Sequence, residues 1–225
     1  MKTDDLIIAL ATSAGPVQPL PRPLVRLARW TLGAALFVAL GVLVIHPRAD
    51  LSTVIREPVF AAVAGTTLVA ALLAAAAAFV LSVPGEERLP LQHYVPFVGA
   101  GVWALGLSIL LAAGGDSLGR LLALPVHTAC VAEIVGLALV PGSMLFAMLR
   151  RAAPLEPAWS AALATLAAVG LGAVATQLIC PIDDPAHQLV GHFAPVAVLV
   201  LLGAVVGRRW LSSAGACCLQ DEAGR

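Results

Sequence analysis

The chain has 225 residues, of which 60% are hydrophobic and 12% are charged, and its formal net charge is +0. Soluble domains contain about 45–50% apolar and about 25% charged residues, so this composition excludes a soluble globular protein and indicates an integral membrane protein. The balanced charge gives no electrostatic reason to expect a nucleic-acid partner.

The N-terminal segment, residues 1–27, precedes every long apolar run. It begins "MKTDDLIIALATSAG", which predicts one short amphipathic helix capped by Thr3 or Asp4. The following "PVQPLPRPL" is typical of an extended, Pro-rich tether. Such a helix either lies on the membrane surface, which its lack of basic residues disfavours, or docks into an apolar groove of a cytoplasmic partner. In the docking interpretation, the contact residues are Thr3, Asp4, Asp5, Leu6, Ile7 and Leu10.

Six apolar runs follow, each close to the length of about 20 residues that a membrane-spanning helix needs. They cover residues 28–46, 58–83, 94–113, 122–148, 158–180 and 192–207. The last run is short, so we expect its helix to begin upstream, near His187. The sequence therefore predicts an all-α, six-helix transmembrane bundle. Its segments are an N-terminal helix and tether at 1–27, a transmembrane domain at 28–210 and a C-terminal tail at 211–225.

The distribution of basic residues predicts the orientation of the bundle. If the N-terminus is cytoplasmic, the inner segments hold ten Lys and Arg residues, whereas the outer loops hold three. Cytoplasmic loops of membrane proteins are enriched in Lys and Arg, so we expect both termini to be cytoplasmic. Within the bundle, small residues crowd the second and fifth spans, which predicts close helix packing. In particular, Gly170 and Gly172 could let the fourth and fifth helices approach closely.

Two cysteines are predicted to share one membrane depth. Cys130 lies at the outer start of the fourth helix, and Cys180 lies at the outer end of the fifth. Each could be a small buried hydrophobe, or the two could form a disulfide if their Cα atoms approach to about 4.4–6.8 Å. Cys217 and Cys218 fall in the inner tail, where thiols stay reduced, and we interpret them as unremarkable.

Polar residues surround the outer cysteines in the sequence "PVHTACVAE". His127 and Glu133 flank Cys130 at three-residue spacing, and Gln177 precedes Cys180 by about one turn. Polar groups inside a membrane are costly, so these side chains should face the bundle or an outer water pocket. They could tune the thiols, clasp the two helices by hydrogen bonds, or bind a thiophilic metal at Cys130, Cys180 and His127.

Two further histidines, His187 and His192, follow Cys180. Either could add an imidazole to a metal-ligand set. We interpret them instead as ordinary polar residues of the outer membrane interface, where amphipathic rings are common.

Taken in order, several motifs resemble those of the negative regulator of sigma F (NrsF) family. They are the start "MKTDDLIIAL", the Pro-rich tether, six spans, "HTACVAE", "RRAAP" at 150–154 and "CPIDD" at 180–184. The resemblance implies a bacterial inner-membrane anti-sigma factor, not an enzyme, whose N-terminal segment holds an extracytoplasmic-function sigma factor. It also implies two outer cysteines that sense metal or oxidative stress. These correspond to Cys130 and Cys180, and no cofactor is implied beyond a metal ion as signal.

Two other functions are compatible with a membrane protein that carries cysteines. A thiol oxidoreductase that reduces quinone would use a close redox pair such as C-x-x-C, which this sequence lacks. A metal or small-solute transporter would place its site near the membrane midplane, whereas this cluster is predicted near one surface.

Overall fold

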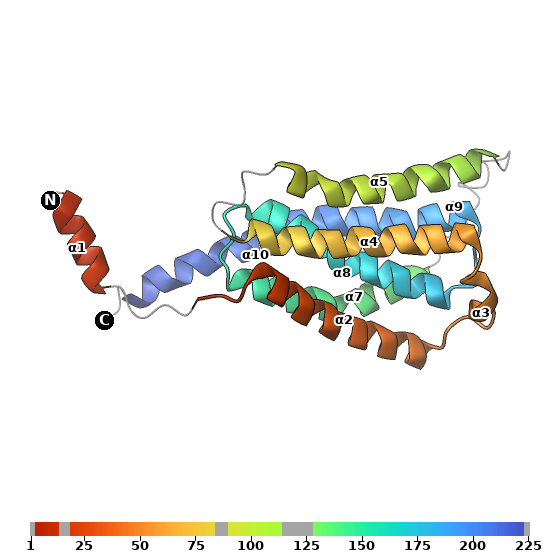
Figure 1. The fold of residues 1–225 in the computed structure, drawn as a ribbon, viewed down its shortest axis with the longest axis horizontal. Coiled ribbons are helices and arrows are strands. Elements are labelled where there is room, and N and C mark those ends of the chain that lie inside the picture. The colour runs from red at the N-terminus through yellow and green to blue at the C-terminus, as the bar shows by residue number, and fades with distance from the viewer. Residues whose placement is uncertain (1–2, 14–18, 84–89, 114–127, 223–225) are drawn as a thin grey trace.

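The computed structural model describes residues 3–13, 19–83, 90–113 and 128–222, and the regular structure in these residues is helical (Figure 1). Prolines stand at the start of five helices because their fixed φ suits the first helical turn, where the missing N–H is not needed. The elements are α1 (Thr3–Ser13), α2 (Pro23–Ile45), α3 (Leu51–Val54), α4 (Pro58–Leu81), α5 (Pro90–Ala113), α7 (Thr128–Arg150), α8 (Pro157–Ile179), α9 (Pro185–His187), the π-helix η2 (Gln188–Phe193) and α10 (Ala194–Glu222).

The prediction of six membrane-spanning helices is confirmed: in the described residues, six helices are long and apolar enough to cross a bilayer. The first begins at Pro23 rather than at residue 28, and its first turns include the buried Arg26. The sixth begins at Pro185, close to the expected start near His187. The expected tail at 211–225 continues α10 as far as Glu222.

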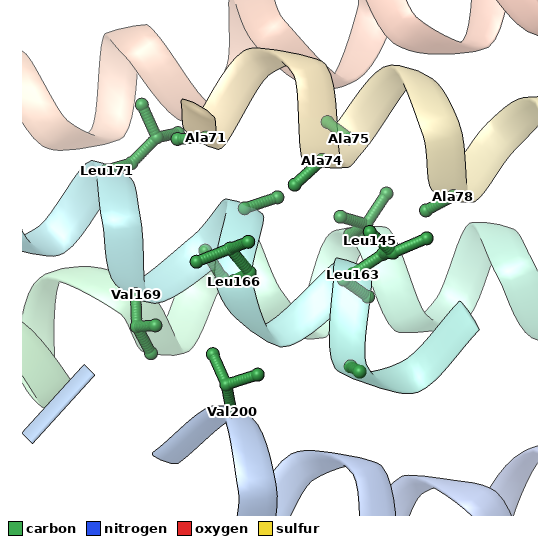
Figure 2. Close-up of a cluster of buried hydrophobic side chains, with 14 of the residues drawn as sticks. Ala71, Ala74, Ala75, Ala78, Leu145, Leu163, Leu166, Val169, Leu171 and Val200 are labelled. Carbon is green, nitrogen blue, oxygen red and sulfur yellow. The ribbon is translucent and has the colours of Figure 1, made fainter. Parts of the chain in front are cut away.

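Helix α8 occupies the centre of the bundle, with α4, α7 and α10 around it (Figure 1). Of its apolar window, 78% is buried inside the protein, against 17–33% for the other spans. A helix surrounded by other helices needs small side chains, because lipid supplies no hydrophobic force and association depends on close contact. Figure 2 shows how alanines of α4 face leucines of α8, with α7 and α10 completing the core. The labelled contacts include Ala71, Ala74, Ala75, Ala78, Leu163, Leu166, Leu171, Leu145 and Val200.

Helices α7 and α8 approach each other closely at Gly172. A Cβ atom there would overlap the backbone carbonyl of Ile134, one turn along α7 from Cys130. The expectation that this glycine brings the fourth and fifth helices together is confirmed. Gly170 serves another contact, because a Cβ atom there would meet Ala71 of α4.

Two hydrogen bonds tie α2 to α7. The Trp30 indole Nε1 donates to the Pro141 carbonyl at 2.9 Å, and the Arg26 guanidinium donates to the Met148 carbonyl at 2.9 Å. Arg26 also donates to the Ser82 hydroxyl at 2.9 Å and lies 4.7 Å from the centre of the Phe79 ring. A buried guanidinium needs such partners, since an unpaired buried charge is costly. The start of α2 is therefore joined to the ends of both α4 and α7.

We predict that Gly172→Ala destabilises the bundle by about 1–3 kcal/mol, because the added methyl group must push α7 away from α8. The thermal midpoint of the protein in detergent would measure this effect. Gly136→Ala is the matched control on α7, since a Cβ atom there meets nothing within 4 Å. Equal midpoints for the two variants would contradict the assigned contact.

Candidate functional site

A cluster of thiol and imidazole side chains lies at the end of the bundle that carries α3 and α9 (Figure 1). Cys130 comes from the first turn of α7, Cys180 ends α8, His187 ends α9, and His192 belongs to the π-helix η2. All four residues are buried, with exposed fractions of 7%, 6%, 1% and 0% respectively. The start of α7 and the continuous stretch from the end of α8 to η2, which are distant in sequence, therefore meet at one enclosed point.

The two sulfur atoms are in contact but are not bonded. Cys130 Sγ lies 3.9 Å from Cys180 Sγ, and both cysteines are free thiols. A disulfide bond is about 2.05 Å long, so the sulfurs would need to approach by about 2 Å to form one. His187 Nε2 lies 3.7 Å from Cys130 Sγ and 3.4 Å from Cys180 Sγ. The pairing of the two cysteines that the sequence suggested is thus present as a dithiol beside an imidazole.

The π-helix brings the two histidines onto one face. In an α-helix, residues five apart point about 140° away from each other, because each residue turns about 100°. A π-helix bonds residue i to residue i+5 and so stacks such residues. The rings of His187 and His192 accordingly meet edge to face, with centroids 5.3 Å apart. Gly191 leaves room for this arrangement, since a Cβ atom there would lie 3.1 Å from His187 Cε1.

Arg48 holds the segment that follows Cys180. Its guanidinium forms ion pairs with Asp183 at 2.6 Å and Asp50 at 2.7 Å, and it donates to the Cys180 carbonyl at 3.1 Å. Its backbone N–H also donates to the Leu178 carbonyl at 3.0 Å. The bond to Asp183 raises the pKa of Arg48, and the bond to Arg48 lowers the pKa of Asp50. The sequence indicated Arg48 only as an outer charge and did not reveal this role.

Two further hydrogen bonds turn the chain back into the bundle. Asp184 caps α9 by accepting from the His187 backbone N–H at 3.4 Å, and Gln188 Nε2 donates to the Ile182 carbonyl at 3.1 Å. The prediction that His187 and His192 are ordinary polar residues of the membrane interface is wrong, because this turn buries both of them. The turn places both rings inside the protein, where the sequence pattern alone suggested a surface position.

A polar clasp between Glu133 and Gln177, one of the alternatives that the sequence left open, is not formed. Both polar atoms of the Gln177 side chain and Oε2 of Glu133 are buried without a hydrogen-bond partner in the part of the chain that the structure describes. Gln177 instead lines a cavity of about 160 Å³, which Phe60 and Gln188 also border. His127, the third predicted metal ligand, lies outside the described residues.

The remaining predicted site residues lie at the other end of the molecule. Helix α1, which carries the expected partner-binding residues, is exposed from residue 3 to residue 12 and lies beyond the bundle (Figure 1). The C-terminal part of α10, which includes Cys217 and Cys218, extends toward the same end. The thiol–imidazole cluster and α1 thus occupy opposite ends of the structure.

Six apolar helices and a buried dithiol at one end define a multi-pass membrane protein with a thiol centre. The sequence model of the family "Negative regulator of sigma F" (NrsF) matches residues 10–212, nearly the whole chain. The protein belongs to this family, as the resemblance of its motifs suggested. Neither a curated protein nor a solved structure matches it.

We predict that Arg48→Gln lowers the thermal midpoint by several degrees, since the two carboxylates and the Cys180 carbonyl lose a shared donor. The sign of the pH effect follows from Asp50, whose pKa is lowered by folding. Its contribution is present above about pH 4, the ordinary pKa of an aspartate, and disappears as the pH falls through the lower folded value.

The midpoint of the wild-type protein should therefore fall more steeply below about pH 4 than that of Arg48→Gln. Arg56→Gln is the matched control, because Arg56 is an exposed arginine of the same connection. If Arg56→Gln lowered the midpoint as much as Arg48→Gln, the ion pairs would not be the cause.

Proposed function

We propose that this protein is an anti-sigma factor of the bacterial inner membrane. In this proposal, α1 holds an extracytoplasmic-function sigma factor on the cytoplasmic side, and Cys130 and Cys180 sense oxidative or metal stress on the outer side. The observation that carries the proposal is the contact of two free thiols, 3.9 Å apart, at the end of the bundle opposite α1. Membership of the family of negative regulators of sigma F supports the sigma-factor partner.

The charge distribution supports this orientation. Arg150 is the last residue of α7 and Arg151 follows it, and Arg208 and Arg209 lie in α10, at the end of the bundle that faces α1. Basic residues favour the cytoplasmic side. In the described residues, the opposite end carries Arg48 and Arg56, and Arg48 is paired with two carboxylates. The cysteines would then face the oxidising compartment, in which disulfides persist.

Helix α1 has the properties of a docking helix. Leu6, Ile7 and Leu10 are exposed by 42%, 58% and 61%, and Asp4 and Asp5 lie in its first turn, where negative charge stabilises a helix. An apolar helical face of this kind can fill a groove on a partner. A sigma factor held by it at the membrane would be kept from RNA polymerase.

A stress signal could reach α1 through α7 and α2. A peroxide would take two electrons from the two thiols, forming the disulfide while the two thiol protons leave in two water molecules. Closing the bond would draw Cys130 and the start of α7 toward α8. Because Arg26 and Trp30 bind carbonyls of α7, the movement would be transmitted to the start of α2, which the tether joins to α1. The change in how α1 is presented would release the sigma factor.

We predict that Leu6→Asp combined with Leu10→Asp weakens sigma-factor binding by about 100-fold, because two apolar anchors become charged. Capture of the sigma factor by the immobilised full-length protein measures this. Ile8→Asp is the matched control: Ile8 is equally apolar and exposed, but it lies about 200° around the helix from Leu6. Retained binding by the double variant, or an equal loss with Ile8→Asp, would disprove docking through this face.

We predict that Cys130→Ser and Cys180→Ser each abolish induction of a sigma-dependent reporter by oxidant, because a single thiol cannot form the intramolecular disulfide. Repression in unstressed cells should remain, since serine fits a site made for a small side chain. Cys217→Ser and Cys218→Ser are controls that should respond as the wild type does. Normal induction in either outer-cysteine variant would rule out the dithiol as the sensor.

A further inference from the structure

We propose that Cys130, Cys180, His187 and His192 together bind a thiophilic divalent d¹⁰ metal ion, Zn²⁺ or Cd²⁺, as two thiolates and two imidazoles. The ligand atoms of these four residues all lie within 4.8 Å of one another. This inference deepens the proposed sensing function and rests on it for its biological consequence, whereas metal binding itself is a separate property. The sequence offered His187 or His192 as additional ligands, and the structure brings both of them to the two cysteines.

The distances among the ligand atoms match those of a tetrahedral site. With Zn–S bonds of about 2.3 Å and Zn–N bonds of about 2.0–2.1 Å, tetrahedral angles place two sulfurs about 3.8 Å apart and sulfur and nitrogen about 3.5 Å apart. The two sulfurs lie 3.9 Å apart, and His187 Nε2 lies 3.7 and 3.4 Å from them. Three of the four ligands are therefore spaced as a bound ion requires, and the ligand nitrogen of His192 lies within 4.8 Å of the other three ligand atoms.

The environment of His192 supports a bound ion independently of the interatomic distances. Its side chain is fully buried, and neither ring nitrogen has a hydrogen-bond partner in the described residues. Buried polar groups almost always have partners, so an imidazole without one needs an explanation. A metal ion bound by one of its nitrogens would provide it. The π-helix, which is rare and often marks functional sites, holds this ring on the same face as His187.

The charge of the ligand set favours a divalent ion. Two thiolates, two neutral imidazoles and one divalent cation have a net charge of zero, which suits a buried position near the membrane. A monovalent ion such as Cu⁺ would leave one negative charge uncompensated. Thiolate and imidazole are also the ligands that Zn²⁺ prefers in structural sites. Binding converts both thiols to thiolates, so two protons leave as one ion enters.

Metal binding and disulfide formation exclude each other at this site. Each thiolate that binds the ion is unavailable as a nucleophile, so a bound ion should protect the dithiol from oxidation. When a peroxide does react, it takes two electrons from the two thiolates and two protons from solvent. The products are the disulfide, two water molecules and the free ion. Oxidation of the metal-bound form would therefore expel the ion.

The test uses the full-length protein, reduced and purified in detergent, with Co²⁺ as spectroscopic probe and Zn²⁺ as competitor. We expect one Co²⁺ per chain, with tetrahedral d–d bands and thiolate-to-cobalt charge transfer, both abolished by Zn²⁺. His187→Gln and His192→Gln should each weaken Zn²⁺ affinity at least about tenfold, since loss of a ligand costs no less than loss of its supporting hydrogen bonds. His46→Asn is the control, because His46 is exposed and asparagine tolerates its positive φ of 77°.

Wild-type affinity in both histidine variants, or octahedral Co²⁺ without thiolate bands, would overturn the proposal. If a variant fails to fold, alkylation of the wild-type protein still decides. Zn²⁺ should slow the reaction of Cys130 and Cys180 with a maleimide, and unchanged rates would also overturn the site. The sensor function fails by a different result, unaltered reporter induction in the cysteine variants, so the two failures can be told apart.

Discussion

Helix α8 has other helices on nearly every side, and this constraint shapes the rest of the bundle. Such a helix has little lipid-facing surface, and small residues such as alanine and glycine let its neighbours approach closely. Gly172 is the critical position, because α7 contacts it through the Ile134 backbone and so brings Cys130 to the depth and distance of Cys180. The thiol contact is thus a consequence of backbone packing one turn deeper in the bundle.

Two buried guanidiniums hold the opposite ends of this core. Arg48 binds Asp50, Asp183 and the Cys180 carbonyl at the end that carries the cluster. Arg26 donates to the Ser82 hydroxyl and the Met148 carbonyl at the end of the bundle that faces α1. An arginine can serve in this way because its planar group presents several fixed donors to acceptors on different helices. Helix α7 has Cys130 at its start and the Arg26 contact near its end, so it physically connects the proposed sensor to the start of α2.

Sequence reasoning predicted the parts of the site that depend on the length of the apolar runs and on the side of the membrane at which each helix ends. The fourth and fifth apolar runs must cross the membrane in opposite directions. This was enough to place Cys130 and Cys180 at the same end of the bundle. The parts that it missed depend on local irregularity. The spacing of apolar residues does not predict the π-helix that brings His187 and His192 together. No motif shows that the segment held by Arg48 turns into the bundle rather than out to the membrane interface. The alternative of a Glu133–Gln177 clasp was based on the similar depth of the two residues and did not consider the direction in which each side chain points.

By itself, the sequence determined the class of the protein, the six spans and the shared depth of two cysteines, because hydrophobic length and chain reversal depend on composition and order alone. The motifs also carried the family resemblance, which the match over residues 10–212 confirmed. Only the tertiary structure decided which polar groups meet. That depends on the rotation of each helix about its axis, on one glycine contact between α7 and α8, and on a turn held by Arg48 and Asp184. Apart from the Asp184 cap, these contacts join residues far apart in the chain, and no local pattern contains them.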